Sequence, residues 1–282
     1  MNKIFKMLFA VYCHLVWLPV SLLSRLFGRE EQAREWFIDT INNSAEVLTE
    51  RGLLFDISHP RLEFRAKNFG AQEPDLIKWM MDKYGKDEIF FDIGANIGYF
   101  SLIAAKETGV MVYAFEPEAL TLAALNKNIF LNDLSKRVVA LPVAVSDRNV
   151  VSYLSMRNFL PGNAYNTFGS DLDFRGGAMN PAFRQGSIGL KLDALVADYQ
   201  LPFPNHVKID VDGNEPEVIR GMQNVLEARE LKTICVELTL ARKDHLDIIE
   251  RLQAAGFTEC AEYINREREA VGTRNYYFER SR

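Results

Sequence analysis

Residues 89–101, IFFDIGANIGYFS, constrain the fold of this 282-residue chain more than any other segment. An apolar run ends at Asp92, a turn with Gly94 and Gly98 follows, and helix-compatible sequence comes next. This order predicts a buried strand of a parallel sheet that carries an acid and a glycine loop to the sheet's edge. Glycine is expected there because the backbone turns sharply and a ligand approaches without a Cβ in its way.

A second acid follows at a spacing that indicates a nucleoside. The apolar run 110–115 ends in Glu116, eighteen residues after Gly98. In doubly wound folds, an acid at the tip of the second strand hydrogen-bonds the two hydroxyls of a ribose. We therefore expect a cofactor that contains a nucleoside.

The loop departs from the dinucleotide fingerprint, which has glycines at its first, third and sixth positions. Counted from Gly94, the third position is Asn96 and the sixth is Tyr99. A side chain lies where a diphosphate would pass, and Asp92 would repel phosphate and attract a cation. These departures argue against NAD and favour S-adenosylmethionine, which has a ribose, a sulfonium and an ammonium. The predicted cofactor-binding residues are Asp92, Gly94, Ala95, Asn96, Gly98, Tyr99, Glu116, Ala144 and Val145.

Composition limits the partners. The chain is 48% hydrophobic and 25% charged, which is typical of a soluble globular protein. A net charge of -5 argues against nucleic acid as a partner, because phosphate binding relies on a basic surface. The cysteines, Cys13, Cys235 and Cys260, are odd in number and far apart, which indicates a reducing compartment and no metal knuckle.

Residues 1–28 form a distinct apolar segment. Residues 7–23 carry no formal charge and would make about 26 Å of helix, slightly short of a bilayer core. No small-residue cleavage site follows, which argues against a removable secretion signal. Three interpretations stay open: a helix on a membrane surface, a helix docked on the protein or a twin subunit, and a span. The first is favoured, so we expect a cytoplasmic protein in peripheral contact with the inner face of a membrane; the oligomeric state is not predicted.

The rest of the chain divides into an extension over residues 29–72 and a cofactor-binding domain over residues 73–282. The extension is predicted as a helix and a hairpin of two strands around His59. In the domain, strands alternate with helices, which predicts an α/β fold with a doubly wound, mostly parallel sheet and an antiparallel C-terminal edge. Helices are expected at 73–84, 119–131, 190–199, 215–228 and 244–255, and strands at 138–145, 150–156, 206–211, 233–238, 258–264 and 275–280.

Residues 157–187 are predicted to be irregular, with five glycines and five aromatic residues. A loop of this length is usually functional or disordered, and its aromatics argue against disorder. It is interpreted either as a structural excursion with its own small cluster, or as a lid or wall of an acceptor site.

The segment HVKIDVDGNEPEVIRGM, residues 206–222, is the other informative pattern. By the two-residue period of a strand, Lys208 and Asp210 share one face. An unpaired ammonium inside a covered sheet is costly, so we predict an ion pair between Lys208 and Glu237 of the next strand. Asp210 and Asp212 follow the strand's carboxyl end, where ligands bind in open α/β sheets.

Four segments together carry a resemblance: FFDIGANIGYFSL, VYAFEPEALTLAALNKN, AVSD, and KIDVDGNEPEVIRGM followed by VEL. Over about residues 73–256 the chain resembles the FkbM family of S-adenosylmethionine-dependent methyltransferases. The resemblance implies a class I methyltransferase fold, which is Rossmann-like with seven strands, and O-methylation, commonly of a sugar or natural-product hydroxyl. The family often has glutamate where this chain has Asp212, and residues 1–60 fall outside the resemblance.

The predicted function is O-methylation of a hydroxyl on a sugar, a glycan or glycolipid precursor, or a related small molecule. Such a hydroxyl needs a base, for which Asp210 is the first candidate and Asp212 the second. Lys208 and Glu237 complete the predicted catalytic set. A magnesium ion held by these carboxylates is a less favoured alternative, and no metal ligands are assigned.

Two other functions are kept as alternatives. The first is a nicotinamide-dependent oxidoreductase on a similar sheet. The second is a catalytically degenerate, membrane-associated scaffold, against which the intact Asp92, Gly94, Gly98, Glu116 and Asp210 argue.

Overall fold

The computed structural model describes residues 17–22, 24–25, 28–35, 46–48, 51–264 and 272–281. The chain divides into two compact units, Met1–Glu46 and Val47–Arg282. In the first unit, the described residues 17–22, 24–25 and 30–35 are helical, and most of the predicted apolar helix lies outside the described residues. Within the described part of the chain, no helix is long and apolar enough to cross a membrane.

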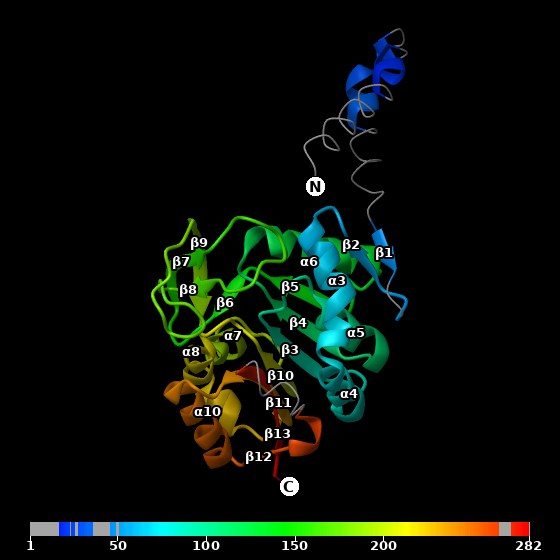
Figure 1. Ribbon diagram of the computed structural model, residues 1–282. Helices are drawn as coiled ribbons and strands as arrows, with labels where there is room; N and C mark the ends of the chain where they lie inside the picture. Colours follow the sequence, from blue (N-terminus) through cyan, green and yellow to red (C-terminus); the bar gives the residue numbers. More distant parts are fainter. Residues whose placement is uncertain are drawn as a thin grey trace. The chain divides into compact units, whose positions relative to one another are not determined.

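The second unit is built on a seven-stranded sheet with the order β12-β13-β11-β10-β3-β4-β5 (Figure 1). The predicted doubly wound sheet is thereby confirmed. Five strands are parallel: β3 (Ile89–Ile93), β4 (Met111–Phe115), β5 (Val138–Leu141), β10 (His206–Ile209) and β11 (Thr233–Thr239). The predicted antiparallel edge is β13 (Thr273–Arg280), which lies between β11 and β12 (Phe257–Glu259). Strand order reverses between β3 and β10, which is where ligands bind in such sheets.

Helices cover both faces of this sheet, as Figure 1 shows for α4 and α5 on one side and α8 and α10 on the other. One buried cluster joins the sheet to α3 (Pro60–Gln72), α4 (Pro74–Lys83), α5 (Tyr99–Thr108) and α6 (Ala119–Leu131). The other joins it to α7 (Leu192–Ala197), α8 (Glu215–Arg220), α9 (Gln223–Glu227) and α10 (Lys243–Ala254). Adjacent residues of β3, Phe90 and Phe91, enter opposite clusters and are both fully buried. A strand covered on both faces explains the continuous apolar run of the sequence.

A second, four-stranded sheet has the order β6-β9-β7-β8. Its strands are β6 (Val143–Val145), β7 (Val150–Met156), β8 (Thr167–Phe168) and β9 (Phe183–Leu190). The single strand predicted over 138–145 is therefore two strands, which belong to different sheets. Pro142 separates them, because it has no N–H to continue the ladder.

The hairpin predicted around His59 is wrong in its second strand. β2 (Leu54–Asp56) pairs instead with β1 (Glu46–Leu48), and α3 begins at Pro60. The His59 side chain accepts a hydrogen bond from the Arg61 N–H at 3.1 Å, and proline suits the first position of a helix. The histidine and proline are thus the start of a helix, and that helix reaches the site described below.

Three predicted elements are shorter than expected. The helix over 215–228 is broken into α8 and α9 at Gly221, where a Cβ would lie 2.0 Å from the Ser146 carbonyl oxygen. The helix over 190–199 is reduced to α7. The strand over 258–264 ends with β12 and continues as a 3₁₀ turn, Ala261–Tyr263.

The predicted ion pair between Lys208 and Glu237 is wrong. Lys208 is in register with Cys235 on β11 and with Asp92 on β3, so Glu237 lies two residues beyond its level. The Lys208 Nζ lies 3.1 Å from Asp210 Oδ2 and 3.5 Å from Asp92 Oδ1. Burial alone would lower the pKa of Lys208, but the two carboxylates hold it above its ordinary value. The ammonium therefore ties β10 to β3 at the reversal point of the sheet.

We predict that Lys208→Met lowers the free energy of unfolding by about 3–5 kcal/mol, because it leaves Asp92 buried without its counter-charge. Glu237→Gln is the control, and it should change stability by less than about 1 kcal/mol, since burial favours the neutral form of Glu237. Urea denaturation followed by circular dichroism measures both. Similar losses for the two variants would show that the ammonium depends on Glu237 after all.

Candidate active site

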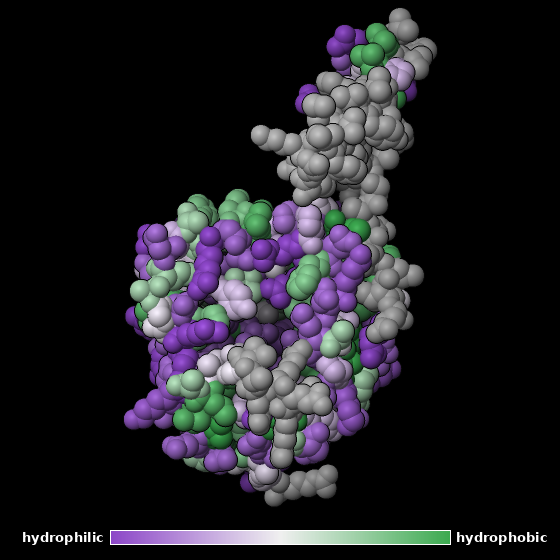
Figure 2. Space-filling view, in the orientation of Figure 1, coloured by the Kyte–Doolittle hydropathy of each residue, from purple (hydrophilic) through white to green (hydrophobic). Residues whose placement is uncertain are grey.

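A cavity of about 500 Å³ opens at the carboxyl ends of the central strands. In Figure 2 the recess in the middle of the molecule is bordered mainly by hydrophilic residues. Six predicted site residues line this cavity: Gly94, Asn96, Glu116, Asp210, Asp212 and Glu237. Ala144 and Val145 line a narrower, more apolar cavity of about 40 Å³, which shares Gly94 and Pro117 with the first. The structure therefore brings eight predicted residues to adjoining cavities.

The other predicted residues lie outside both linings: Asp92, Ala95, Gly98, Tyr99 and Lys208. Asp92 accepts a hydrogen bond from Ser101 Oγ at 2.6 Å and pairs with Lys208. The ring of Tyr99 stacks on Phe55 with 5.5 Å between ring centroids. Asp92, Tyr99 and Lys208 therefore support the glycine loop through contacts inside the protein, on the side away from the cavity.

The two glycines of the loop are required by close packing within the protein. Both have positive φ, 81° at Gly94 and 82° at Gly98. A Cβ on Gly94 would lie 1.8 Å from the Asp210 carbonyl oxygen, and one on Gly98 would lie 2.2 Å from Leu125. The loop thus sits directly on the end of β10 and on α6, which is a stronger requirement than the approach of a ligand.

Glu116 is held at the tip of β4 by the backbone. Its Oε2 accepts the Asn96 N–H and its Oε1 accepts the Glu118 N–H, both at 2.9 Å. Burial raises the pKa of Glu116 to about 8; the two N–H bonds oppose this shift, and the charge of Glu118 adds to it. Each carboxylate oxygen has a further lone pair, so this group can accept hydrogen bonds from the two hydroxyls of a ribose.

The opposite wall of the cavity is acidic. Asp212 adopts a left-handed conformation with φ 55°, and its Oδ2 accepts the Tyr165 N–H at 2.6 Å. Burial and the neighbouring Asp210 raise the pKa of Asp212 to about 7. Burial, followed by Asp210 and Asp212, raises the pKa of Glu237 well above its ordinary value. Such a wall suits a ligand that carries a sulfonium and an ammonium.

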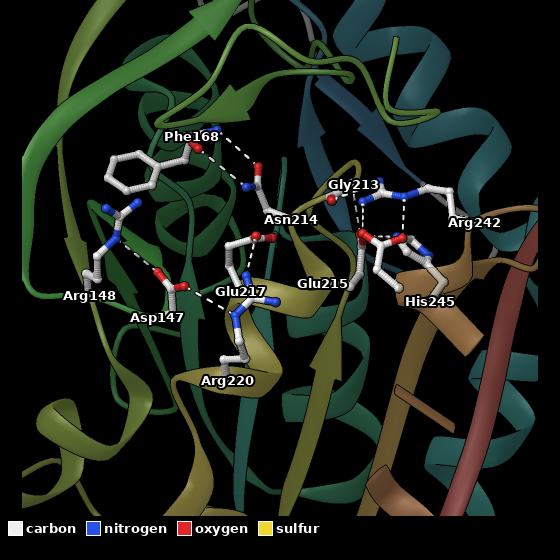
Figure 3. Close-up of polar contacts among 11 residues, drawn as sticks. Asp147, Arg148, Phe168, Gly213, Asn214, Glu215, Glu217, Arg220, Arg242 and His245 are labelled. Atoms are coloured by element: carbon white, nitrogen blue, oxygen red, sulfur yellow. Dashed lines mark hydrogen bonds and ion pairs between the residues drawn. The ribbon is translucent and has the colours of Figure 1, made fainter. Parts of the chain in front are cut away.

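The loop that carries Asp212 is clamped to the excursion between β7 and β9, as Figure 3 shows. The Asn214 amide accepts the Phe168 N–H at 3.1 Å and donates to the Phe168 carbonyl at 3.3 Å. The Arg242 Nη1 donates to the carbonyls of Gly213 and Phe174, at 3.0 and 3.1 Å. Two far-apart segments of the chain are thereby joined at the cavity.

Below this loop, Glu215 and His245 are both almost fully buried (Figure 3). Glu215 Oε1 accepts the N–H groups of Val211 and Gly213, and its Oε2 lies 3.4 Å from His245 Nε2. His245 Nδ1 accepts the Thr239 N–H, so the ring proton is on Nε2 and faces Glu215. Burial lowers the pKa of His245 to about 4, so a neutral imidazole supports the carboxyl group.

The sequence analysis missed part of the lining. Arg65, Phe69 and Gln72 come from α3, where a strand was expected. Their spacing of four and three residues is that of one helix face, and this pattern could have identified them. From the predicted irregular section, the lining residues are Asn163, Ala164, Tyr165, Asn166, Phe174 and Arg175. This placement favours the interpretation of that section as a wall of the site.

Among the described residues, no group of three or more histidine, cysteine, aspartate or glutamate side chains is arranged to hold a metal ion.

The doubly wound sheet, the acid held at the tip of β4 and the acidic cavity fit an S-adenosylmethionine-dependent methyltransferase of class I. Residues 92–259 match the model of the methyltransferase FkbM domain. Because the match covers more than half of the chain, the protein belongs to the FkbM methyltransferase family. The nicotinamide-dependent alternative is thereby set aside.

Two curated relatives are similar to the chain. Hexuronic acid methyltransferase AglP of Haloferax volcanii is 27% identical over 202 residues, covering 71% of this chain and 75% of that protein. 31-O-demethyl-FK506 methyltransferase FkbM of Streptomyces tacrolimicus is 28% identical over 196 residues, covering 62% and 74%. Among solved structures, TYW2 of M. jannaschii in complex with AdoMet has a TM-score of 0.42 at 14% identity, over 84% of this chain and 87% of that chain.

We predict that adenosine binding depends on pH through Glu116. Ribose hydroxyls donate to the ionised carboxylate, so binding lowers the pKa of Glu116 from about 8 and releases a proton. The Kd should fall by up to about tenfold per pH unit from pH 6 to 8 and level off above. Adenosine is chosen because it lacks the titrating amino group of S-adenosylmethionine.

Titration calorimetry of wild type and Glu116→Gln measures this effect. The variant should bind adenosine more weakly at pH 8.5 and show no such slope. A slope that survives in Glu116→Gln would assign the proton to another group.

Proposed function

We propose that the chain transfers a methyl group from S-adenosylmethionine to a hydroxyl of a sugar, a glycan or glycolipid precursor, or a related small molecule. The observation that carries this proposal is Asp212, a carboxyl group with a pKa near 7 held by Tyr165 at the cavity wall. A base for a hydroxyl is most effective when its pKa is near the working pH. The printed names of the two relatives, one acting on a hexuronic acid, support a sugar or similar acceptor.

Asp212 is a better base than Asp210, which reverses the order expected from sequence. Asp210 lies 3.1 Å from the Lys208 ammonium, and this ion pair occupies the carboxylate that a base would need to offer to the acceptor hydroxyl. Asp212 makes no ion pair among the described residues, and it is held in a strained left-handed conformation. Strained backbone persists at functional sites, where a side chain must be aimed.

The walls around Asp212 suit a sugar ring. The rings of Tyr165 and Phe174 lie 4.8 Å apart by centroid, and Tyr165 is 46% exposed. Both line the cavity beside carboxylate and amide groups. An aromatic surface packs against the apolar face of a pyranose, and the polar groups accept hydrogen bonds from its hydroxyls.

Bound S-adenosylmethionine supplies the methyl group on a positively charged sulfur. Asp212 receives the proton that the acceptor hydroxyl loses, while the hydroxyl oxygen bonds to the methyl carbon and the bond from that carbon to sulfur breaks with its electron pair left on sulfur. Glu116 and the glycine loop fix the nucleoside, and the aromatic wall fixes the acceptor. Positioning of the two reactants supplies much of the acceleration.

We predict that Asp212→Asn lowers kcat by about 10²–10⁴-fold, the range for loss of a general base. Affinity for S-adenosylhomocysteine should stay within about threefold, because the variant keeps the shape of the site. In wild type saturated with S-adenosylmethionine, kcat/KM for the acceptor should rise with pH up to about 7 and then level off, since the base acts only when ionised.

The assay measures S-adenosylhomocysteine release with 4-nitrophenyl glucoside and glucuronide as acceptors. Asp147→Asn, a change at a carboxylate outside the cavity, is the control and should keep wild-type kinetics. Turnover by Asp212→Asn above half of wild type would remove Asp212 as the base. Absence of turnover on every hydroxyl acceptor in wild type, with S-adenosylhomocysteine still bound, would favour the scaffold alternative.

We further propose that residues 1–28 attach the enzyme to the cytoplasmic face of a membrane. The apolar sequence supports this, together with Lys3 and Lys6, which favour anionic lipid. Deletion of residues 1–28 should move the enzyme from the membrane to the soluble fraction without loss of turnover. Fractionation with high-salt and carbonate washes tests this. A soluble full-length protein would contradict membrane attachment, and resistance to carbonate would favour a span.

A further inference from the structure

The main cavity contains many carboxylates and few cations. Its acidic lining residues are Glu73, Glu116, Asp210, Asp212 and Glu237, and its basic lining residues are Arg65 and Arg175. This balance suits the sulfonium and the ammonium of S-adenosylmethionine. The same ligand also carries an α-carboxylate, which these acidic groups would repel unless a cation faces it.

Arg65 has the free donors that such a carboxylate requires. It is half-buried on α3, its Nε donates to the Gly162 carbonyl at 3.0 Å, and its guanidinium lies 5.0 Å from the Phe69 ring centroid. Among the described residues, no hydrogen bond or ion pair uses either of its Nη atoms. A guanidinium that lines an acidic cavity therefore has two nitrogens left to bind a ligand.

Contacts of the 162–163 peptide place Arg65 beside the cofactor loop. The Gly162 carbonyl accepts from Arg65, and the next carbonyl, that of Asn163, accepts from Asn96 Nδ2 at 3.1 Å. A Cβ on Gly162 would lie 3.5 Å from Ile97 Cγ2 and 3.6 Å from Arg65 Cγ. The aliphatic part of the Arg65 side chain and the glycine loop therefore both lie next to Gly162.

Arg175 is less suited to this role. It is exposed, and its guanidinium lies 5.1 Å from the ring of Phe174 on the excursion. A solvent-exposed cation interacts only weakly with a carboxylate, because water screens the pair.

We propose that Arg65 binds the α-carboxylate of S-adenosylmethionine through its two Nη atoms. The planar guanidinium matches a carboxylate with two parallel hydrogen bonds, which a lysine cannot reproduce. The hydrogen bond from its Nε to the Gly162 carbonyl orients the guanidinium before the ligand binds. Arg65 is thereby a cofactor-binding residue that the glycine-loop motif does not include.

The test compares two ligands that differ only in the carboxylate: S-adenosylhomocysteine and its decarboxylated analogue, S-adenosyl-3-thiopropylamine. Titration calorimetry gives the ratio of their Kd values in each variant. In wild type, S-adenosylhomocysteine should bind about tenfold or more tighter, the effect of hydrogen bonds to a charged group. In Arg65→Met the ratio should fall to near one, and Arg65→Lys should be intermediate because it keeps the charge without the two parallel hydrogen bonds.

The matched control is Arg61→Met, which removes the same charge from α3 one turn earlier, outside the cavity lining, and should keep the wild-type ratio. A purely structural role of Arg65 would weaken both ligands by the same factor and leave the ratio unchanged, which overturns the proposal. If Arg65→Met does not fold, the ratio in Arg65→Lys decides, and a wild-type ratio there overturns it.

A second experiment distinguishes binding of the cofactor's carboxylate by Arg65 from binding of an acidic group on the acceptor. Turnover of 4-nitrophenyl glucuronide and glucoside is compared in wild type and Arg65→Lys. If the variant keeps the ligand ratio but loses its preference between these acceptors, Arg65 recognises the acceptor and the proposal fails. The binding ratio is independent of any acceptor, so failure of the proposed hydroxyl methylation leaves this test intact.

Discussion

The structure of the cavity depends on the ionic contacts that the buried Lys208 ammonium makes with Asp210 and Asp92. The ammonium bonds Asp210 and lies 3.5 Å from Asp92, so one charge joins the residues from which both cavity loops start. Close packing at the same point, where Gly94 meets the Asp210 carbonyl, leaves the loops a single relative position. Two carboxylates and an ammonium are costly to remove from water, and their mutual pairing offsets that cost together with the Ser101 hydrogen bond to Asp92. The relative position of the two loops that line the cavity is therefore set by one buried cluster.

Lys208 compensates only part of the negative charge at this end of the sheet. Asp212, Glu116 and Glu237 have raised pKa values because they are buried near one another. Binding a sulfonium and an ammonium relieves this repulsion, so the cavity recognises S-adenosylmethionine by charge as well as by shape. Methyl transfer converts the sulfonium to a neutral thioether, which removes one of these attractions. The same electrostatics therefore favour substrate binding over retention of the product.

The sequence alone was sufficient to place a residue in the cavity where the position of that residue follows from its own strand. Glu116 and Asp210 are such residues, because strand periodicity and the end of an apolar run place them without knowledge of a neighbour. The Lys208 partner was missed because strand adjacency does not fix register, and in the sheet Lys208 aligns with Asp92. Arg65 was missed because the sequence before Pro60 resembles a turn, whereas His59 caps a helix.

In the proposed mechanism, the excursion between β7 and β9 couples acceptor recognition to the position of the base. Its Tyr165 N–H binds the Asp212 carboxylate, and the ring of the same residue forms the aromatic wall with Phe174. Arg242 joins the Phe174 carbonyl to that of Gly213, where a Cβ would lie 2.8 Å from the Phe174 Cα. The strained backbone of the Asp212 loop is held by these contacts, so a shift of the wall moves the base with it. Under the proposed function, a change of acceptor preference therefore requires the wall and the Asp212 loop to change together.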